Sequence, residues 1–90
     1  MKAEELIISH KEDLQSLGVK HLIIYGSHAH ENERIGSDID IIIDLKDIRQ
    51  FFNVRKYLMN LLNLKIDMTM LQDISPKYRR YVFINHKEVF

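Results

Sequence analysis

Two polar clusters stand beside apolar runs in the first half of the chain. Gly26 and Ser27 follow one such run, and Asp38 and Asp40 open another. Because successive residues of a strand point to opposite faces, Asp38 and Asp40 are expected to project from the same face. Two close carboxylates repel each other, and a hard divalent cation such as Mg²⁺ relieves that repulsion. The pattern therefore predicts a Mg²⁺ site at the start of a strand.

The Gly26-Ser27 pair would form a turn between the first strand and the loop that follows. Such a turn offers backbone N–H groups and a hydroxyl to a phosphate, and glycine can adopt positive φ there. A phosphate cradle opposite a metal site is typical of phosphoryl or nucleotidyl transfer. The plainer interpretation of Asp38-x-Asp40 is a helix or turn cap with a nearby surface acid. The isoleucines that follow disfavour it, because an apolar strand seldom opens with two carboxylates on one face.

These residues resemble a known signature. Gly26-Ser27, a ten-residue spacer, and Asp38-x-Asp40 are similar to the motif of the minimal nucleotidyltransferases, within the DNA polymerase β-like superfamily. Ser37, the last residue of the spacer, also fits that motif. The resemblance extends over most of the chain.

The resemblance implies roles for particular residues. Gly26, Ser27 and Ser37 would bind the nucleotide, and Asp38 and Asp40 would ligate two Mg²⁺ ions with ATP as substrate. Members of the family use a third carboxylate on a later strand, and Asp67 occupies that place. Asp67 would be the base that deprotonates the attacking hydroxyl or a shared metal ligand; without the resemblance, a solvated strand residue explains it equally well.

The chain departs from the family in one segment. Many relatives read Gly-Ser-Arg-Ala-Arg-Gly, whereas this chain has His28 and His30 at the arginine positions and Glu31 at the glycine position. Two permanent cations are thereby lost beside the expected triphosphate. The histidines would be solvated, or weak phosphate neighbours, or metal ligands with a third ligand that the sequence does not identify. Arg34 would reach a phosphate or remain a solvated charge.

Composition sets broader limits. Ninety residues make one small domain, 1–90, and the apolar content of 46% is that of a soluble globular protein. Thirteen basic and thirteen acidic residues cancel, which disfavours strong non-specific binding to nucleic acid and favours self-association or a protein partner. No cysteine is present, in keeping with a reducing cytoplasm. We expect a cytoplasmic protein without a membrane segment or signal peptide.

The hydrophobic periodicity predicts a small α/β (α+β) domain with a mixed sheet covered by helices. The carboxylates and Ser27 would converge at an edge of that sheet. The expected helices cover residues 3–17, 47–62 and 77–82, and the expected strands cover 19–25, 38–44 and 64–71.

Several elements leave alternatives open. His10 would be a packing residue in the first helix, which Gly18 would end. The 47–62 helix would turn a wide apolar surface to the sheet or leave part of it for a partner. Ile48, Phe51, Phe52, Leu58, Met59 and Leu62 form the predicted sheet-facing stripe, with Val54, Tyr57 and Leu61 off its axis.

The sequence also allows more than one interpretation of the C-terminal region. Ser75 and Pro76 would start the closing helix, whose basic residues Lys77, Arg79 and Arg80 would hold phosphates or remain solvated. The final apolar residues would dock as a strand or pair with another chain.

The predicted reaction is attack by a hydroxyl on the α-phosphorus of ATP, with pyrophosphate leaving. The chain shows no obvious part that would select an acceptor, so a second protein is expected to supply it. Family resemblance implies a HEPN-domain ribonuclease toxin as that partner, neutralised by AMP transfer to a tyrosine. The alternative is a weakly catalytic or inactive module that neutralises its partner by contact alone. A third reading, a subunit that modifies RNA or a small molecule, is disfavoured by the neutral charge.

Overall fold

The computed structural model describes residues 3–25, 39–84 and 86–90. Its centre is a mixed sheet, as the sequence predicted, with strand order β3-β2-β1-β4. β1 pairs antiparallel with both β2 and β4, and β2 pairs parallel with β3. β1 is apolar on both faces after His21, as a strand with neighbours on both sides can be, and it lies between β2 and β4. The strands are β1 (Val19–Tyr25), β2 (Ile39–Leu45), β3 (Ile66–Met70) and β4 (His86–Glu88).

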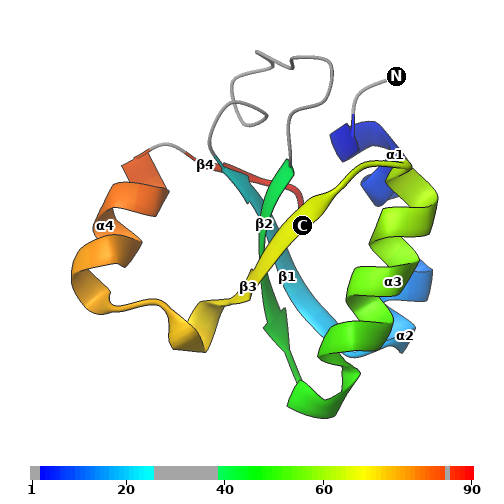
Figure 1. Cartoon of the computed structure of the whole chain (residues 1–90), viewed down its shortest axis with the longest axis horizontal. Coiled ribbons are helices and arrows are strands. Elements are labelled where there is room, and N and C mark those ends of the chain that lie inside the picture. Colours follow the sequence, from blue (N-terminus) through cyan, green and yellow to red (C-terminus); the bar gives the residue numbers. More distant parts are fainter. Residues whose placement is uncertain (1–2, 26–38, 85) are drawn as a thin grey trace.

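Helices lie on both sides of the sheet. Figure 1 shows α1, α2 and α3 together on one side and α4 on the other. Within the described residues, no helix is long and apolar enough to cross a membrane. The α-helices are α1 (Ala3–Ser9), α2 (Lys11–Ser16), α3 (Phe51–Leu62) and α4 (Pro76–Ile84), and the short 3-10 turns are η2 (Ile48–Gln50) and η3 (Leu71–Asp73).

The N-terminal helix was predicted to be continuous, and that prediction is wrong. The chain breaks at His10, where the backbone N–H bonds to the Ile7 carbonyl at 3.1 Å, a tighter turn than an α-helix makes. A ring nitrogen of His10 lies 2.9 Å from the Leu6 carbonyl, the group that a continuous helix would use for its backbone ladder. His10 is half-buried and its ring meets that of Tyr57, so its expected packing role is confirmed.

Gly18 ends α2 as predicted. Its φ of 95° lies in the left-handed region, which costs glycine little. Its carbonyl accepts a hydrogen bond of 2.9 Å from the N–H of Lys46, which follows β2. The same residue thus stops the helix and ties the start of β1 to the end of β2.

The alternation of side chains gives the sheet two different faces. One face packs against α1, α2 and α3 and holds the main core, which includes Leu22, Ile24, Ile41 and Ile43. On the other face, a smaller cluster joins Ile23 and Ile42 to Ile74, with Tyr25 and Leu71 packed against it. The central strands are therefore apolar on both faces because both are covered over part of their length.

The predicted sheet-facing stripe of α3 needs correction at its N-terminal end. Ile48 is 55% exposed and Phe52 is 75% exposed, whereas Val54, which was placed off the axis, is fully buried with Leu58. Residues 48–50 form a 3-10 turn, so they do not continue the 3.6-residue period of α3. Phe52 lies two residues from Val54 and therefore faces away from the sheet.

The C-terminal residues complete the sheet. β4 was not part of the predicted order of elements, although docking of this segment as a strand was one alternative. The Leu22 carbonyl accepts a hydrogen bond of 2.9 Å from the N–H of Val89, and both Val89 and Phe90 pack on the main core. The docking alternative is confirmed for Val89 and Phe90, whereas Phe83 and Ile84, which the same prediction included, lie in α4.

Candidate functional site

Two carboxylates stand side by side on adjacent strands. Asp40 of β2 and Asp67 of β3 are register partners in the parallel pair. Each follows an isoleucine, Ile39 or Ile66, that is buried in the main core on the opposite face. The Ile39 N–H also donates to the Lys65 carbonyl at 3.1 Å, which fixes the register at the start of both strands. Strand alternation therefore directs both aspartates to the face that carries α4.

Tyr25 extends this row onto β1, where it is the register partner of Asp40. Burial, followed by the charge of Asp40, the neighbouring Tyr78, the charge of Asp67 and a hydrogen bond with the Tyr78 side chain, raises the pKa of Tyr25 to about 12. The phenol is therefore neutral at physiological pH. Tyr25, Asp40 and Asp67 form a polar row across three strands, which we call the carboxylate row.

The carboxylate row lies at one end of its face. The cluster of Ile23, Ile42 and Ile74 occupies the middle of that face. At the other end of β2, Asp44 forms an ion pair of 3.5 Å with Lys20, so this carboxylate already has a cationic partner. Among the described acids of β2, Asp40 is thus the one placed beside a second carboxylate.

Helix α4 brings a second tyrosine to the row. Ser75 precedes the helix and its Oγ accepts a hydrogen bond of 3.3 Å from the Tyr78 N–H, which confirms its predicted role as a cap. Tyr78 is 46% exposed, and its side chain hydrogen-bonds to Tyr25. Tyr25 ends the apolar run that precedes Gly26, and neither Tyr25 nor Tyr78 was predicted to be a site residue. The position of Tyr25 directly before Gly26 was the available signal.

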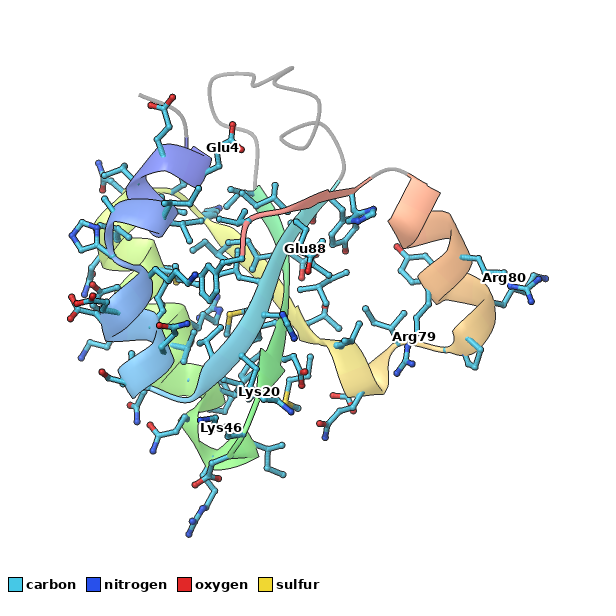
Figure 2. The ribbon with its side chains drawn as sticks, turned by 180° about the vertical axis from the view of Figure 1, so that it is seen from behind. Glu4, Lys20, Lys46, Arg79, Arg80 and Glu88 are labelled. Atoms are coloured by element: carbon cyan, nitrogen blue, oxygen red, sulfur yellow. The ribbon has the colours of Figure 1, made fainter. Side chains whose placement is uncertain are left out.

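The basic residues of α4 do not act as one cluster. Arg79 donates a hydrogen bond of 3.0 Å to the Leu71 carbonyl, and thereby ties α4 to the turn that follows β3. Lys77 and Arg80 are exposed. Figure 2 shows Arg80 pointing outward from α4, away from the rest of the chain. The solvated alternative is therefore the better description of Lys77 and Arg80, and Arg79 serves the fold.

The other predicted site residues lie outside the described part of the chain. They are Gly26, Ser27, Ser37 and Asp38, together with the loop residues His28, His30, Glu31 and Arg34. The structure therefore brings together Asp40 and Asp67, while the convergence of the remaining residues on them stays a prediction.

The donor atoms of the carboxylate row fit a hard cation. Carboxylate oxygens are the protein ligands that Mg²⁺ prefers, and Asp40 and Asp67 project from neighbouring strands, which lie about 4.8 Å apart in a sheet. Over residues 3–25, 39–84 and 86–90, no group of three acidic, histidine or cysteine side chains is close enough to hold a metal. The row supplies two of the three carboxylates that the sequence suggested, since Asp38 lies outside the described residues.

A shallow apolar groove lies beside edge strand β3. Its volume is about 380 Å³, and the exposed Ile48 and Phe52 form part of its wall. The apolar surface of the 47–62 region is therefore divided between the core and a solvent-facing groove. The groove is lined by Ile48, Phe51, Phe52, Met68, Thr69, Met70 and Asp73.

Sequence comparison extends the resemblance. The family model described as polymerase beta, nucleotidyltransferase matches residues 5–90. A protein of Methanocaldococcus jannaschii named as a protein adenylyltransferase is 36% identical over 69 residues, which cover 72% of this chain and 80% of that relative. The protein adenylyltransferase MntA of Thermococcus cleftensis is 31% identical over 76 residues, covering 80% of this chain and 77% of the relative.

Solved structures share the fold at lower identity. A toxin–antitoxin complex with AMP-PNP superposes with a TM-score of 0.75 at 21% identity, covering 97% of this chain and 72% of the other. A tri-AMPylated HEPN toxin of Shewanella oneidensis in complex with its MNT antitoxin gives a TM-score of 0.66 at 17% identity, covering 97% of this chain and 71% of the other. At these identities the likeness concerns the fold alone.

Proposed function

The chain belongs to the polymerase beta nucleotidyltransferase family, and we propose that it transfers AMP from ATP to a hydroxyl group of a partner protein. The observation that carries the proposal is the in-register pair of Asp40 and Asp67 on adjacent parallel strands. The relatives named as protein adenylyltransferases supply the reaction class. A HEPN-domain toxin is the proposed acceptor, since such a toxin is the AMPylated partner in the Shewanella oneidensis complex. The chain would then act as an antitoxin, in the cytoplasm where ATP is available.

The donor set suits Mg²⁺, which when bound would neutralise charge on the phosphates and lower the pKa of the attacking hydroxyl. In this proposal Asp38, Asp40 and Asp67 hold the metal, and Asp67 also accepts the proton of the attacking hydroxyl. Gly26, Ser27 and Ser37 bind the nucleotide through backbone N–H groups and hydroxyls. The acceptor oxygen forms a bond to the α-phosphorus as the bond to the pyrophosphate oxygen breaks.

Tyr25 has a supporting part in this arrangement. Its phenol remains protonated beside Asp40 and Asp67, so it adds no third negative charge to the carboxylate row. Its ring packs against the Ile23 and Ile42 cluster, which limits water on that side of the row. Both effects favour a cation and a phosphate at the exposed end of the sheet.

A second candidate is neutralisation by contact, without AMP transfer. The apolar groove beside β3, with Phe52 at 75% exposure, is a surface suited to a protein partner. The loss of the family arginines at His28 and His30 favours the same alternative. Both activities would involve the same partner but different surfaces.

Labelled ATP separates the two candidates. The purified chain is incubated with Mg²⁺, ATP carrying a labelled α-phosphate, and a HEPN-domain toxin from the same genome. We expect label on the toxin, which Asp40→Asn and Asp67→Asn remove and which Asp44→Asn leaves in place, because Asp44 pairs with Lys20 away from the row. Neutralisation of the toxin without any label, by all four proteins alike, would overturn AMP transfer in favour of contact.

A further inference from the structure

The chain carries a hydroxyl of its own beside the carboxylate row. Tyr78 hydrogen-bonds to Tyr25, and Tyr25 is close enough to Asp40 and Asp67 for both charges to act on its phenol. The register places these three residues in one row across β1, β2 and β3. Tyr78 belongs to α4, and this helix lies on the side of the sheet opposite α1, α2 and α3 (Figure 1).

The two phenols differ in accessibility. Tyr25 packs against the Ile23 and Ile42 cluster and is held between that cluster and Asp40. Tyr78 is 46% exposed, so a nucleotide entering from solvent reaches it without disturbing the core. The Ser75 cap and the Arg79 contact with the Leu71 carbonyl hold the first turn of α4, so the position of Tyr78 is set by the fold.

We propose that Tyr78 is a self-modification site, to which the chain transfers AMP when no partner hydroxyl occupies the acceptor position. This inference rests on the proposed nucleotidyl transfer. It adds an acceptor of the same chemical class, a phenolic hydroxyl, that is already present at the site. The proposed modification is in cis, because Tyr78 lies beside the carboxylate row of its own molecule.

The step balances without any further reactant. The Tyr78 oxygen forms a bond to the α-phosphorus of ATP as the bond between that phosphorus and the bridging oxygen of pyrophosphate breaks. The phenolic proton passes to the Asp67 carboxylate and then to solvent, and pyrophosphate leaves. The product is an AMP phosphodiester on Tyr78, which places a new negative charge beside Asp40 and Asp67 and fills the space in front of them. The modified chain therefore loses activity toward its partner.

The test uses the whole chain with labelled ATP and Mg²⁺ and no partner, followed by mass mapping of the labelled peptide. We expect one AMP on Tyr78, formed at a rate per molecule that does not depend on protein concentration. Tyr78→Phe removes the self-label, because it lacks the acceptor hydroxyl. Tyr57→Phe is the matched control, because its hydroxyl bonds to Asp13 and its ring packs on His10, away from the row.

The outcomes distinguish this inference from the proposed function. Label on the toxin when it is present, together with no label on the chain when the toxin is absent, overturns self-modification alone. Label on neither protein in either assay overturns both proposals. Self-label that maps to a residue other than Tyr78, or whose rate rises with protein concentration, also overturns the inference. Mapping on the unaltered chain does not depend on how well Tyr78→Phe folds, and circular dichroism of that variant checks its fold.

Discussion

Replacing Asp67 with asparagine should stabilise the metal-free protein and remove its stabilisation by Mg²⁺. Asp40 and Asp67 project from adjacent strands in register, so their carboxylates face the same side of the sheet. Asparagine has nearly the same shape as aspartate and lacks its charge. The substitution therefore removes a repulsion and a metal ligand with little change in packing.

The strand spacing gives the size of the effect. Two unit charges about 5 Å apart interact by about 0.8 kcal/mol at the dielectric constant of water and by about 3 kcal/mol at an effective value near 20. Asp67 is exposed and Asp40 is half-buried, so solvent screening places the gain near the lower end, at about 1 kcal/mol. For a domain of this size, about 1 kcal/mol corresponds to a rise in Tm of roughly 4–8 °C.

Thermal unfolding followed by circular dichroism measures both quantities. In EDTA at low ionic strength, Asp67→Asn should melt above the unaltered protein, and addition of Mg²⁺ should raise the Tm of the unaltered protein only. High salt should shrink the difference in EDTA, because it screens the repulsion between exposed charges.

Asp44→Asn is the matched control for this prediction. The residue lies on the same strand and face as Asp40, but it forms an ion pair with Lys20 at 3.5 Å. Its neutralisation removes an attraction and should not raise the Tm in EDTA. The reasoning fails if Asp67→Asn melts below the unaltered protein in EDTA, or if Mg²⁺ stabilises both proteins equally.

Three further predictions follow from the described residues. Because the folded state raises the pKa of Tyr25 from 10.0 to about 12 by burial and by Asp40, it keeps this proton longer than the unfolded state does. Stability should therefore fall as the pH rises between those values, and Tyr25→Phe should flatten that part of a urea-unfolding profile; an unchanged slope would contradict the assignment. On α3, Leu58→Ala should cost about 2–5 kcal/mol of unfolding free energy, whereas Phe52→Ala should cost less than about 0.5 kcal/mol, and equal costs would contradict their opposite exposure. Ser75→Ala should cost about 1 kcal/mol through the lost cap of α4, and amide exchange at Tyr78 should rise with it.

The elements that the sequence predicted well are those with strict local rules. A strand alternates its side chains with a period of two, so the run around Ile41 to Ile43 indicated both the strand and the common face of its acids. Gly18 and Ser75 have local conformational preferences that do not depend on distant contacts, and both positions were predicted correctly.

The errors have tertiary causes. The break at His10 depends on the contact of its ring nitrogen with the Leu6 carbonyl, which hydrophobic periodicity does not register. The outward position of Phe52 follows from the 3-10 turn at residues 48–50, which shifts the helical phase. Ile48 and Phe52 were assigned to the core because residues 47–62 were treated as one α-helix with a period of 3.6 residues. A 3-10 turn has a period of three residues, so the assignment failed at this end of the helix.

The carboxylate row illustrates where sequence reasoning reaches its limit. Each aspartate could be assigned to a face from its own strand, but the pairing of Asp40 with Asp67 depends on the register between two strands joined through α3. The hydrogen bond from the Ile39 N–H to the Lys65 carbonyl sets that register. It joins two backbone groups, so the residue types at these positions do not predict it. The position of Tyr78 at the site depends in addition on the packing of α4 on the same face of the sheet. The strand residues Asp40 and Asp67 could therefore be predicted from the sequence pattern and the family resemblance. Tyr78 could be placed at the site only from the structure, because tertiary packing of α4 brings it there. Tyr78 carries the acceptor hydroxyl that we propose.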